Sequence, residues 1–157
     1  MGLILDENLI FTNINYKDKN DVLNFLSEKL LKQGYVRPGY PKGIIAREQQ
    51  YPTGLPSQGI GIAIPHTDND LVNETSVAIG VLENPVIFQS MEDPSVELNI
   101  HIVIMLAIKE PHGQIEMLQK IIAIIQNVEL TEKITKANDS KEVLALIEPY
   151  ILSKQIN

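Results

Sequence analysis

The sequence predicts an α/β protein in which helices cover both faces of a mixed β-sheet. Segments with helical spacing of apolar residues stand near both ends of the chain, and strand-like runs rich in Val and Ile lie between them. The strongest run, Val96–Ile108, is apolar on both faces in its second half, which indicates a central strand covered on both sides. Helices that flank several strands in this way pack most naturally on the two faces of one sheet.

The first half of the chain contains two expected helices. One runs from about Asp21 to Gln33, with Asn20 as its N-cap and Gly34 at its end. The second, about Pro41–Gln50, follows a Pro-Gly turn and is stopped by Pro52. Both are short enough to lie across one sheet.

The second half of the chain contains two more expected helices. The first, Pro111–Gln126, returns to helical spacing with an apolar face. The members of that face are Ile115, Leu118, Ile121, Ile122 and Ile125. The last helix, about Ser140–Lys154, must accommodate Pro149.

Between these helices we expect a loop and several strands. Tyr51–Gln58 is rich in Gly and Pro and reads as a loop, and Gly59–Ile64 as a short strand. Its alternating isoleucines share one face: Ile60, Ile62 and Ile64. Thr75–Leu82 and Val86–Phe88 are expected to be two strands joined near Asn84-Pro85.

Length, composition and charge exclude several classes of protein. The chain has 157 residues and no dividing linker, so we expect residues 1–157 to form a single domain. Its net charge is −7 without a basic cluster, which argues against nucleic-acid partners. It has no cysteine, which excludes disulfides and cysteine-type zinc sites. With no signal-peptide pattern and no stretch of the roughly 20 apolar residues that span a bilayer, we expect a cytoplasmic protein without membrane insertion.

The most unusual segment is GIGIAIPHTD, Gly59–Asp68, in which a buried-type strand leads directly into Pro-His. Pro65 fixes its own φ and keeps Ile64 extended, so the His66 imidazole leaves the strand end at a defined angle. Glycines at positions 59 and 61 remove side chains where another backbone, or a partner, needs close approach. A histidine with an unperturbed pKa of about 6.5 is mostly neutral at pH 7 and can act as a nucleophile.

The alternative is that Pro65-His66 forms only a turn after a strand. Two features favour a functional role. The preceding loop, Tyr51–Gln58, is rigid and carries hydroxyl groups. A second histidine, His112, stands at the expected start of a helix, where backbone N–H groups favour an anion.

The run GIGIAIPH resembles the active-site signature of the fructose/mannitol-type enzyme IIA domains of the bacterial sugar phosphotransferase system. The resemblance extends along nearly the whole chain. It includes GYV at Gly34–Val36, RE at Arg47-Glu48 and EVLALI at Glu142–Ile147. The stretch YPTGLPSQGIGIAIPHTD is most similar to the galactitol-type subgroup.

The resemblance implies a phosphotransferase/anion transport-like sandwich and a phosphocarrier function. His66 matches the family's phosphorylated histidine, which accepts a phosphoryl group from HPr through Nε2. The group then passes to a IIB component, and finally to a sugar, galactitol or a related alditol, that enters through the membrane component IIC. Since galactitol-type IIB resembles cysteine phosphocarriers and this chain has no cysteine, IIB would be a separate chain. No cofactor or metal is needed.

The resemblance also implies residues that support the transfer. Arg47 matches an arginine near the family's active site and could pair with phosphate bidentately, although a solvated charge at a helix end is an equal alternative. The family's second histidine corresponds to Gln114 by helix register and to His112 by residue type. Either side chain could donate a hydrogen bond to phosphate, and we slightly favour His112. His101, on the central strand, is expected to have a structural or partner-facing role.

Two rival functions are compatible with parts of this pattern. A regulatory relative would use the same phosphorylated histidine to control another protein. A metal-dependent hydrolase would draw on a set of His and Asp side chains whose spacing matches no known metal signature. That set is His66, Asp68, Asp70, His101 and His112. Neither the sugar nor the oligomeric state can be derived from the sequence.

Overall fold

The computed structural model describes residues 4–56, 59–110 and 115–152, and in them five strands form one mixed sheet in the order β1-β4-β5-β3-β2. The strands are β1 Ile10–Ile14, β2 Gly54–Leu55, β3 Ile62–Ala63, β4 Ser76–Gln89 and β5 Glu97–Ala107. β5 lies at the centre, as predicted, antiparallel to β4 and parallel to β3. Its second half is buried on both faces, which is what its sequence indicates.

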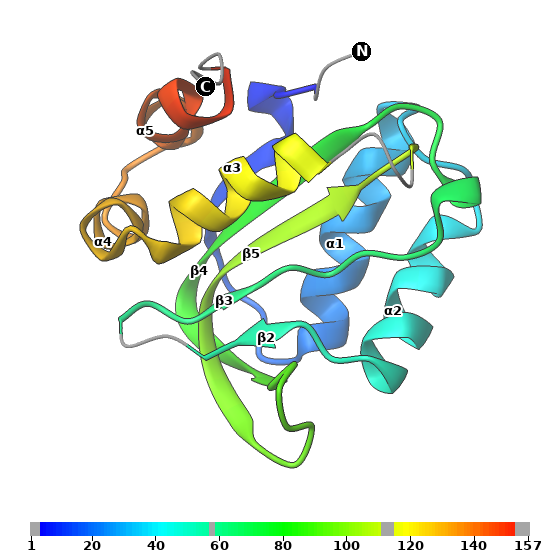
Figure 1. Cartoon of the computed structure of the whole chain (residues 1–157), viewed down its shortest axis with the longest axis horizontal. Helices are drawn as coiled ribbons and strands as arrows, with labels where there is room; N and C mark the ends of the chain where they lie inside the picture. The colour runs from blue at the N-terminus through cyan, green and yellow to red at the C-terminus, as the bar shows by residue number, and fades with distance from the viewer. Residues whose placement is uncertain (1–3, 57–58, 111–114, 153–157) are drawn as a thin grey trace.

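Helices cover both faces of this sheet (Figure 1). They are α1 Lys19–Lys32, α2 Tyr40–Gln50, α3 Ile115–Gln126, α4 Val128–Thr135 and α5 Ser140–Leu152, with short 3₁₀ turns η1 Glu7–Leu9 and η2 Asn69–Leu71. α1 and α2 pack on one face around Tyr40, Phe88 and Met105. The helices α3, α4 and α5 pack on the other around Ile79, Ile104 and Ile147. The predicted α/β class is therefore confirmed.

The strand β1 and the helix α4 have no counterpart among the sequence expectations. β1 is an edge strand, and Asn13, at φ 56°, interrupts its alternation between buried and exposed side chains. α4 is only eight residues long, with a buried face that includes Leu130 and Ile134. The Asn127 side chain caps it by accepting a hydrogen bond from the Leu130 amide.

Several predicted boundaries were wrong. The side chain of Asp18, rather than Asn20, caps α1, by accepting a hydrogen bond from the Asn20 amide. The two strands expected on either side of Asn84-Pro85 are one strand, β4. Its pairing with β5 shifts register between Val81 and Val86, and Pro85 lies within this irregularity. Proline is tolerated at such a position because the ladder bond that it cannot make is already absent.

The segment that leads to His66 has the predicted faces but a shorter strand. Within the expected strand Gly59–Ile64, only the two residues of β3 pair with β5. Ile60 and Ile64 nevertheless pack with Ile62 in the core beneath α3–α5, as their alternation predicts. The expected loop before it contains β2, whose Gly54 and Leu55 pair with β3.

The apolar face of α3 differs from the prediction at one position. Ile121 is buried as expected, but Ile122 is 46% exposed, and Ile124 is buried in its place at 2% exposure. Positions 121 and 124 lie three residues apart on one face, whereas Ile122 points away from the sheet. Residues 111–114 and 153–154 of the predicted helices, and the side chain of Ile115, lie outside the described residues.

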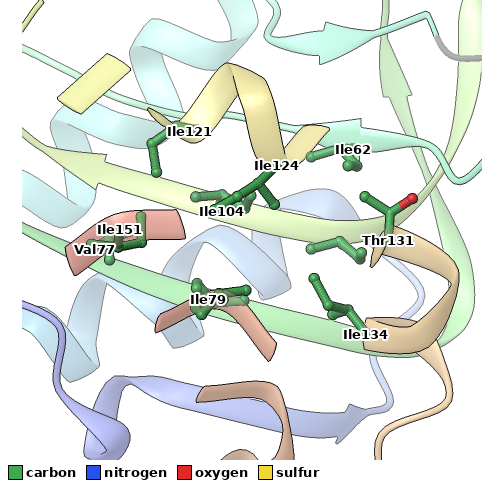
Figure 2. A pocket seen from close by; sticks show the side chains of 11 residues that line it. Ile62, Val77, Ile79, Ile104, Ile121, Ile124, Thr131, Ile134 and Ile151 are labelled. Carbon is green, nitrogen blue, oxygen red and sulfur yellow. The ribbon is translucent and has the colours of Figure 1, made fainter. Parts of the chain in front are cut away.

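A cavity of about 10 Å³ lies between the sheet and α3–α5 (Figure 2). Its lining is apolar, with Ile79, Ile104 and Ile121 among its residues, apart from Thr131. The Thr131 hydroxyl already donates to the Val128 carbonyl oxygen. A void this small and apolar is a packing defect of the core. In the part of the chain described, no helix is both long and apolar enough to cross a bilayer.

Candidate functional site

The backbone that leads into His66 is hydrogen-bonded to the central strand β5. The preceding residue, Pro65, is buried, and its carbonyl oxygen accepts a 2.9 Å hydrogen bond from the Leu106 amide on β5. The Leu106 carbonyl oxygen in turn accepts a 2.7 Å hydrogen bond from the buried Tyr40 hydroxyl on α2. The half-buried imidazole therefore starts from a backbone fixed to the central strand.

The ring of His66 has one nitrogen committed to the backbone. Nδ1 lies 3.0 Å from the carbonyl oxygen of Ile64. A carbonyl oxygen can only accept, so Nδ1 carries the proton that it donates. In the neutral imidazole the lone pair is then on Nε2. This arrangement presents Nε2 as a nucleophile and keeps the ring in one tautomer.

Two glycines let neighbouring backbone segments approach the site closely. A Cβ at Gly61 would overlap the backbone carbonyl oxygen of Asn99 on β5. A Cβ at Gly54 would lie 2.6 Å from the carbonyl oxygen of Gln89 on β4. At Gly59 the nearest neighbour is a side-chain atom of Val128, 3.0 Å away. The predicted backbone approach is therefore confirmed at Gly61, where it lets β3 pair with β5, whereas at Gly59 the close neighbour is a side chain.

Arg47 lies beside the segment that carries His66. Its Nη1 atom is 3.4 Å from Oδ1 of Asp68, two residues after His66, and its guanidinium lies over the ring of Tyr51 at 4.9 Å. The Nε atom is buried and has no hydrogen-bond partner among the described residues. The side chain is 38% exposed, so the guanidinium can still reach an anion that arrives from solvent.

Glu48 and Thr53 form a buried pair that sequence analysis did not single out. Glu48 is 1% exposed. Its two oxygens accept hydrogen bonds from the Thr53 amide and hydroxyl, each 2.7 Å long. Burial raises the pKa of Glu48, and the two bonds from Thr53 oppose that rise. A signal was present in the sequence, because Glu48 stands four residues after Ile44 on the buried face of α2.

The remaining candidates are only partly placed. His112 and Gln114 lie outside the described residues. The His101 amide donates to the Gly61 carbonyl oxygen, and its Nδ1 is buried without a partner among the described residues. Within those residues, no three His, Asp or Glu side chains are grouped closely enough to hold a metal ion.

The chain matches the family model for the phosphoenolpyruvate-dependent sugar phosphotransferase system, EIIA 2, over residues 3–150. The chain belongs to this family. It is 30% identical over 123 residues to the galactitol-specific EIIA component of Escherichia coli (strain K12), which covers 77% of this chain and 80% of that protein. It is 27% identical to the mannitol-specific EIICBA component of Pasteurella multocida, over 94% of this chain and 23% of that protein.

A solved relative shows the same fold in a functional complex. Enzyme IIA of the Escherichia coli mannitol system, bound to phosphorylated enzyme IIB, superposes with a TM-score of 0.76 at 26% identity. The match covers 94% of this chain and 99% of that one. EIIA components are phosphotransferases that pass a phosphoryl group to a IIB component, so the predicted phosphocarrier function is confirmed.

Proposed function

We propose that His66 is the phosphorylated residue of this EIIA protein, with HPr as the donor and a separate IIB chain as the acceptor. The observation that carries the proposal is the 3.0 Å contact between Nδ1 of His66 and the Ile64 carbonyl oxygen, which leaves Nε2 free to react. The step needs only in-line positioning and stabilisation of the three equatorial oxygens.

The transfer balances without any further reactant. The Nε2 lone pair forms a bond to the phosphorus of the donor's phosphohistidine while the donor's P–N bond breaks and its electron pair returns to the donor ring. The His66 ring becomes a phosphorylated imidazolium with its proton still on Nδ1. The Ile64 carbonyl oxygen, 3.0 Å away, stabilises that positive charge. Transfer to IIB reverses these changes at Nε2.

Three groups are proposed to bind the phosphoryl oxygens. The first is Arg47, which pairs with Asp68 two residues after His66 and has a side chain that is 38% exposed to an arriving anion. The second group is the backbone amides of the loop. The third is the side chain of His112 or Gln114. The Lys109 carbonyl oxygen accepts a 3.3 Å hydrogen bond from Asn69, so the chain approaches the His66 segment shortly before residue 112.

The relatives support the wider setting of the proposal. Similarity to the galactitol-specific EIIA component of Escherichia coli supports galactitol or a related alditol as the sugar of this system. The mannitol complex with phosphorylated IIB supports a IIB acceptor. We further propose that the chain is one domain acting in the cytoplasm with a membrane IIC component, and that it has no nucleic-acid partner.

Reconstituted transfer tests this function. Phospho-HPr, generated from phosphoenolpyruvate and enzyme I, should phosphorylate the chain, and purified galactitol-type IIB should then take the group. A mannitol-type IIB is the specificity control and should accept more slowly. Phosphorylation without transfer to either IIB would contradict the transport role and support the regulatory alternative. No phosphorylation at all would contradict the phosphocarrier role of this chain.

A further inference from the structure

Helix α2 reaches both residues that precede His66 through short chains of hydrogen bonds. On one side, the buried Tyr40 hydroxyl bonds to the Leu106 carbonyl oxygen, and the Leu106 amide bonds to Pro65. On the other side, Glu48 binds Thr53 with both carboxylate oxygens. The Thr53 carbonyl oxygen then accepts a 3.2 Å hydrogen bond from the Ile64 amide.

The second of these chains ends on the imidazole itself. The Ile64 amide donates its hydrogen bond to the Thr53 carbonyl oxygen, and the Ile64 carbonyl oxygen accepts one from Nδ1 of His66. The amide and the carbonyl of Ile64 flank a single Cα, and the following Pro65 restricts the backbone of Ile64 to extended conformations. A shift of Thr53 therefore changes the direction of the carbonyl that selects the His66 tautomer.

We infer that Glu48 is a positioning residue for phosphoryl transfer, acting through Thr53 and Ile64 to hold His66 with its proton on Nδ1. This inference rests on the proposed role of His66. Glu48 is 1% exposed, and a carboxylate buried to this extent needs hydrogen-bond donors. Both of its oxygens accept hydrogen bonds from Thr53, in the loop that precedes His66. Outer hydrogen bonds of this kind fix the orientation and tautomer of a reactive histidine.

Two substitutions of Glu48 separate hydrogen bonding from bulk. Glu48→Leu keeps a side chain of similar size but removes both acceptors. In Glu48→Gln, the amide oxygen can accept from the Thr53 N–H while the amide nitrogen donates to the Thr53 hydroxyl. The readouts are the ¹⁵N chemical shifts of the His66 ring in the unphosphorylated protein, which report the tautomer, and the rate of phosphorylation by phospho-HPr.

Glu48→Leu should populate the Nε2–H tautomer and slow phosphorylation about tenfold, the lower end of the effect of removing an outer hydrogen-bond partner. Glu48→Gln should restore the Nδ1–H tautomer and most of the rate. Ile147→Ala is the matched control, because it weakens the core on the opposite face of the sheet. It should lower the melting temperature without moving the ring shifts.

Two results would overturn the inference. One is an unchanged tautomer in Glu48→Leu, whatever the rate of phosphorylation. The other is a change in ring shifts in Ile147→Ala equal to that in Glu48→Leu. If Glu48→Leu does not fold, Thr53→Val and Thr53→Ser replace it, since only serine keeps the hydroxyl that binds Glu48. The tautomer is measured without a donor, so a chain that HPr does not phosphorylate refutes the proposed function while leaving the positioning test intact.

Discussion

Arg47 and Asp68 face each other beside His66, with Nη1 of the arginine 3.4 Å from Oδ1 of the aspartate. The two side chains are 38% and 69% exposed, so their attraction is screened by solvent and weak. An arriving phosphoryl group carries more charge than one carboxylate and can compete for the guanidinium. The pair therefore keeps Arg47 beside the chain segment that carries His66 and can release it at little cost.

Removing Arg47 should slow phosphorylation with little effect on stability. We expect Arg47→Ala to lower the single-turnover rate about tenfold, which corresponds to roughly 1.4 kcal/mol of lost transition-state stabilisation. Arg47→Lys should give an intermediate rate, because an ammonium cannot bind two oxygens in parallel. Lys42→Ala, which removes an exposed charge on the same helix, is the control. Equal rates for Arg47→Ala and Lys42→Ala would show that the guanidinium does not contact the phosphoryl group.

His112 and Gln114 can be distinguished by the rate of onward transfer. A protonated His112 would form a charge-assisted bond to phosphate, about twice as strong as the neutral bond of Gln114. His112→Ala should therefore still be phosphorylated but should transfer to IIB about tenfold more slowly, and Gln114→Ala should do less. Rapid-quench measurements with IIB test this ranking. The reverse ranking would assign the supporting role to Gln114, as helix register does.

Gly61 should tolerate no side chain. Its Cβ would overlap the backbone carbonyl oxygen of Asn99, which cannot move without separating β3 from β5. Gly61→Ala should cost about 1–3 kcal/mol in denaturant unfolding and slow phosphorylation, because β3 leads directly to His66. Gly59→Ala is the control, since its Cβ meets only the movable side chain of Val128. Similar stability of the two variants would contradict the described pairing of β3 with β5.

The stability of the protein should depend on pH through Glu48. Burial raises the pKa of Glu48, so the folded state binds this proton more tightly than the unfolded chain does. The contribution of Glu48 to stability must then fall as pH rises from its ordinary pKa of about 4.3 toward the raised value. The glutamine of Glu48→Gln does not titrate. The free energy of unfolding of this variant, relative to that of the wild type, should therefore rise as pH increases through this range.

Urea unfolding at several pH values between about 4 and 7 measures this difference. Glu132→Gln, which removes an exposed carboxylate on α4, controls for the change in net charge. A difference between wild type and Glu48→Gln that is constant with pH, or that shrinks as pH rises, would contradict the raised pKa.

The sequence predicted those parts of the fold whose patterns are long or locally complete. The central position of β5 follows from its two apolar faces, and the alternation of Ile60, Ile62 and Ile64 predicts the buried face around β3. β1 could not be predicted, because five residues interrupted by the left-handed Asn13 carry no clear alternation. The irregularity that joins both halves of β4 across Asn84-Pro85 depends on the partner strand.

The same contrast applies to the site. Pro65 constrains the backbone before His66 by local sterics, so a histidine held at the strand end was predictable from the motif, although its ring is half-buried. The contact between Nδ1 and the Ile64 carbonyl, and the chain from Glu48 through Thr53, depend on how α2 docks against the loop. Tertiary packing sets these distances, and adjacent residue types do not reveal them.

Locating the phosphoryl group on the phosphorylated protein tests the central claim most directly. The chain is incubated with phosphoenolpyruvate, enzyme I and HPr, and the product is mapped by mass spectrometry and by ³¹P and ¹⁵N NMR. We predict one acid-labile, base-stable phosphoryl group on Nε2 of His66, absent from His66→Ala and retained in His101→Ala. Labelling that persists in a folded His66→Ala variant, or a phosphoryl group on Nδ1 of His66, would contradict the account.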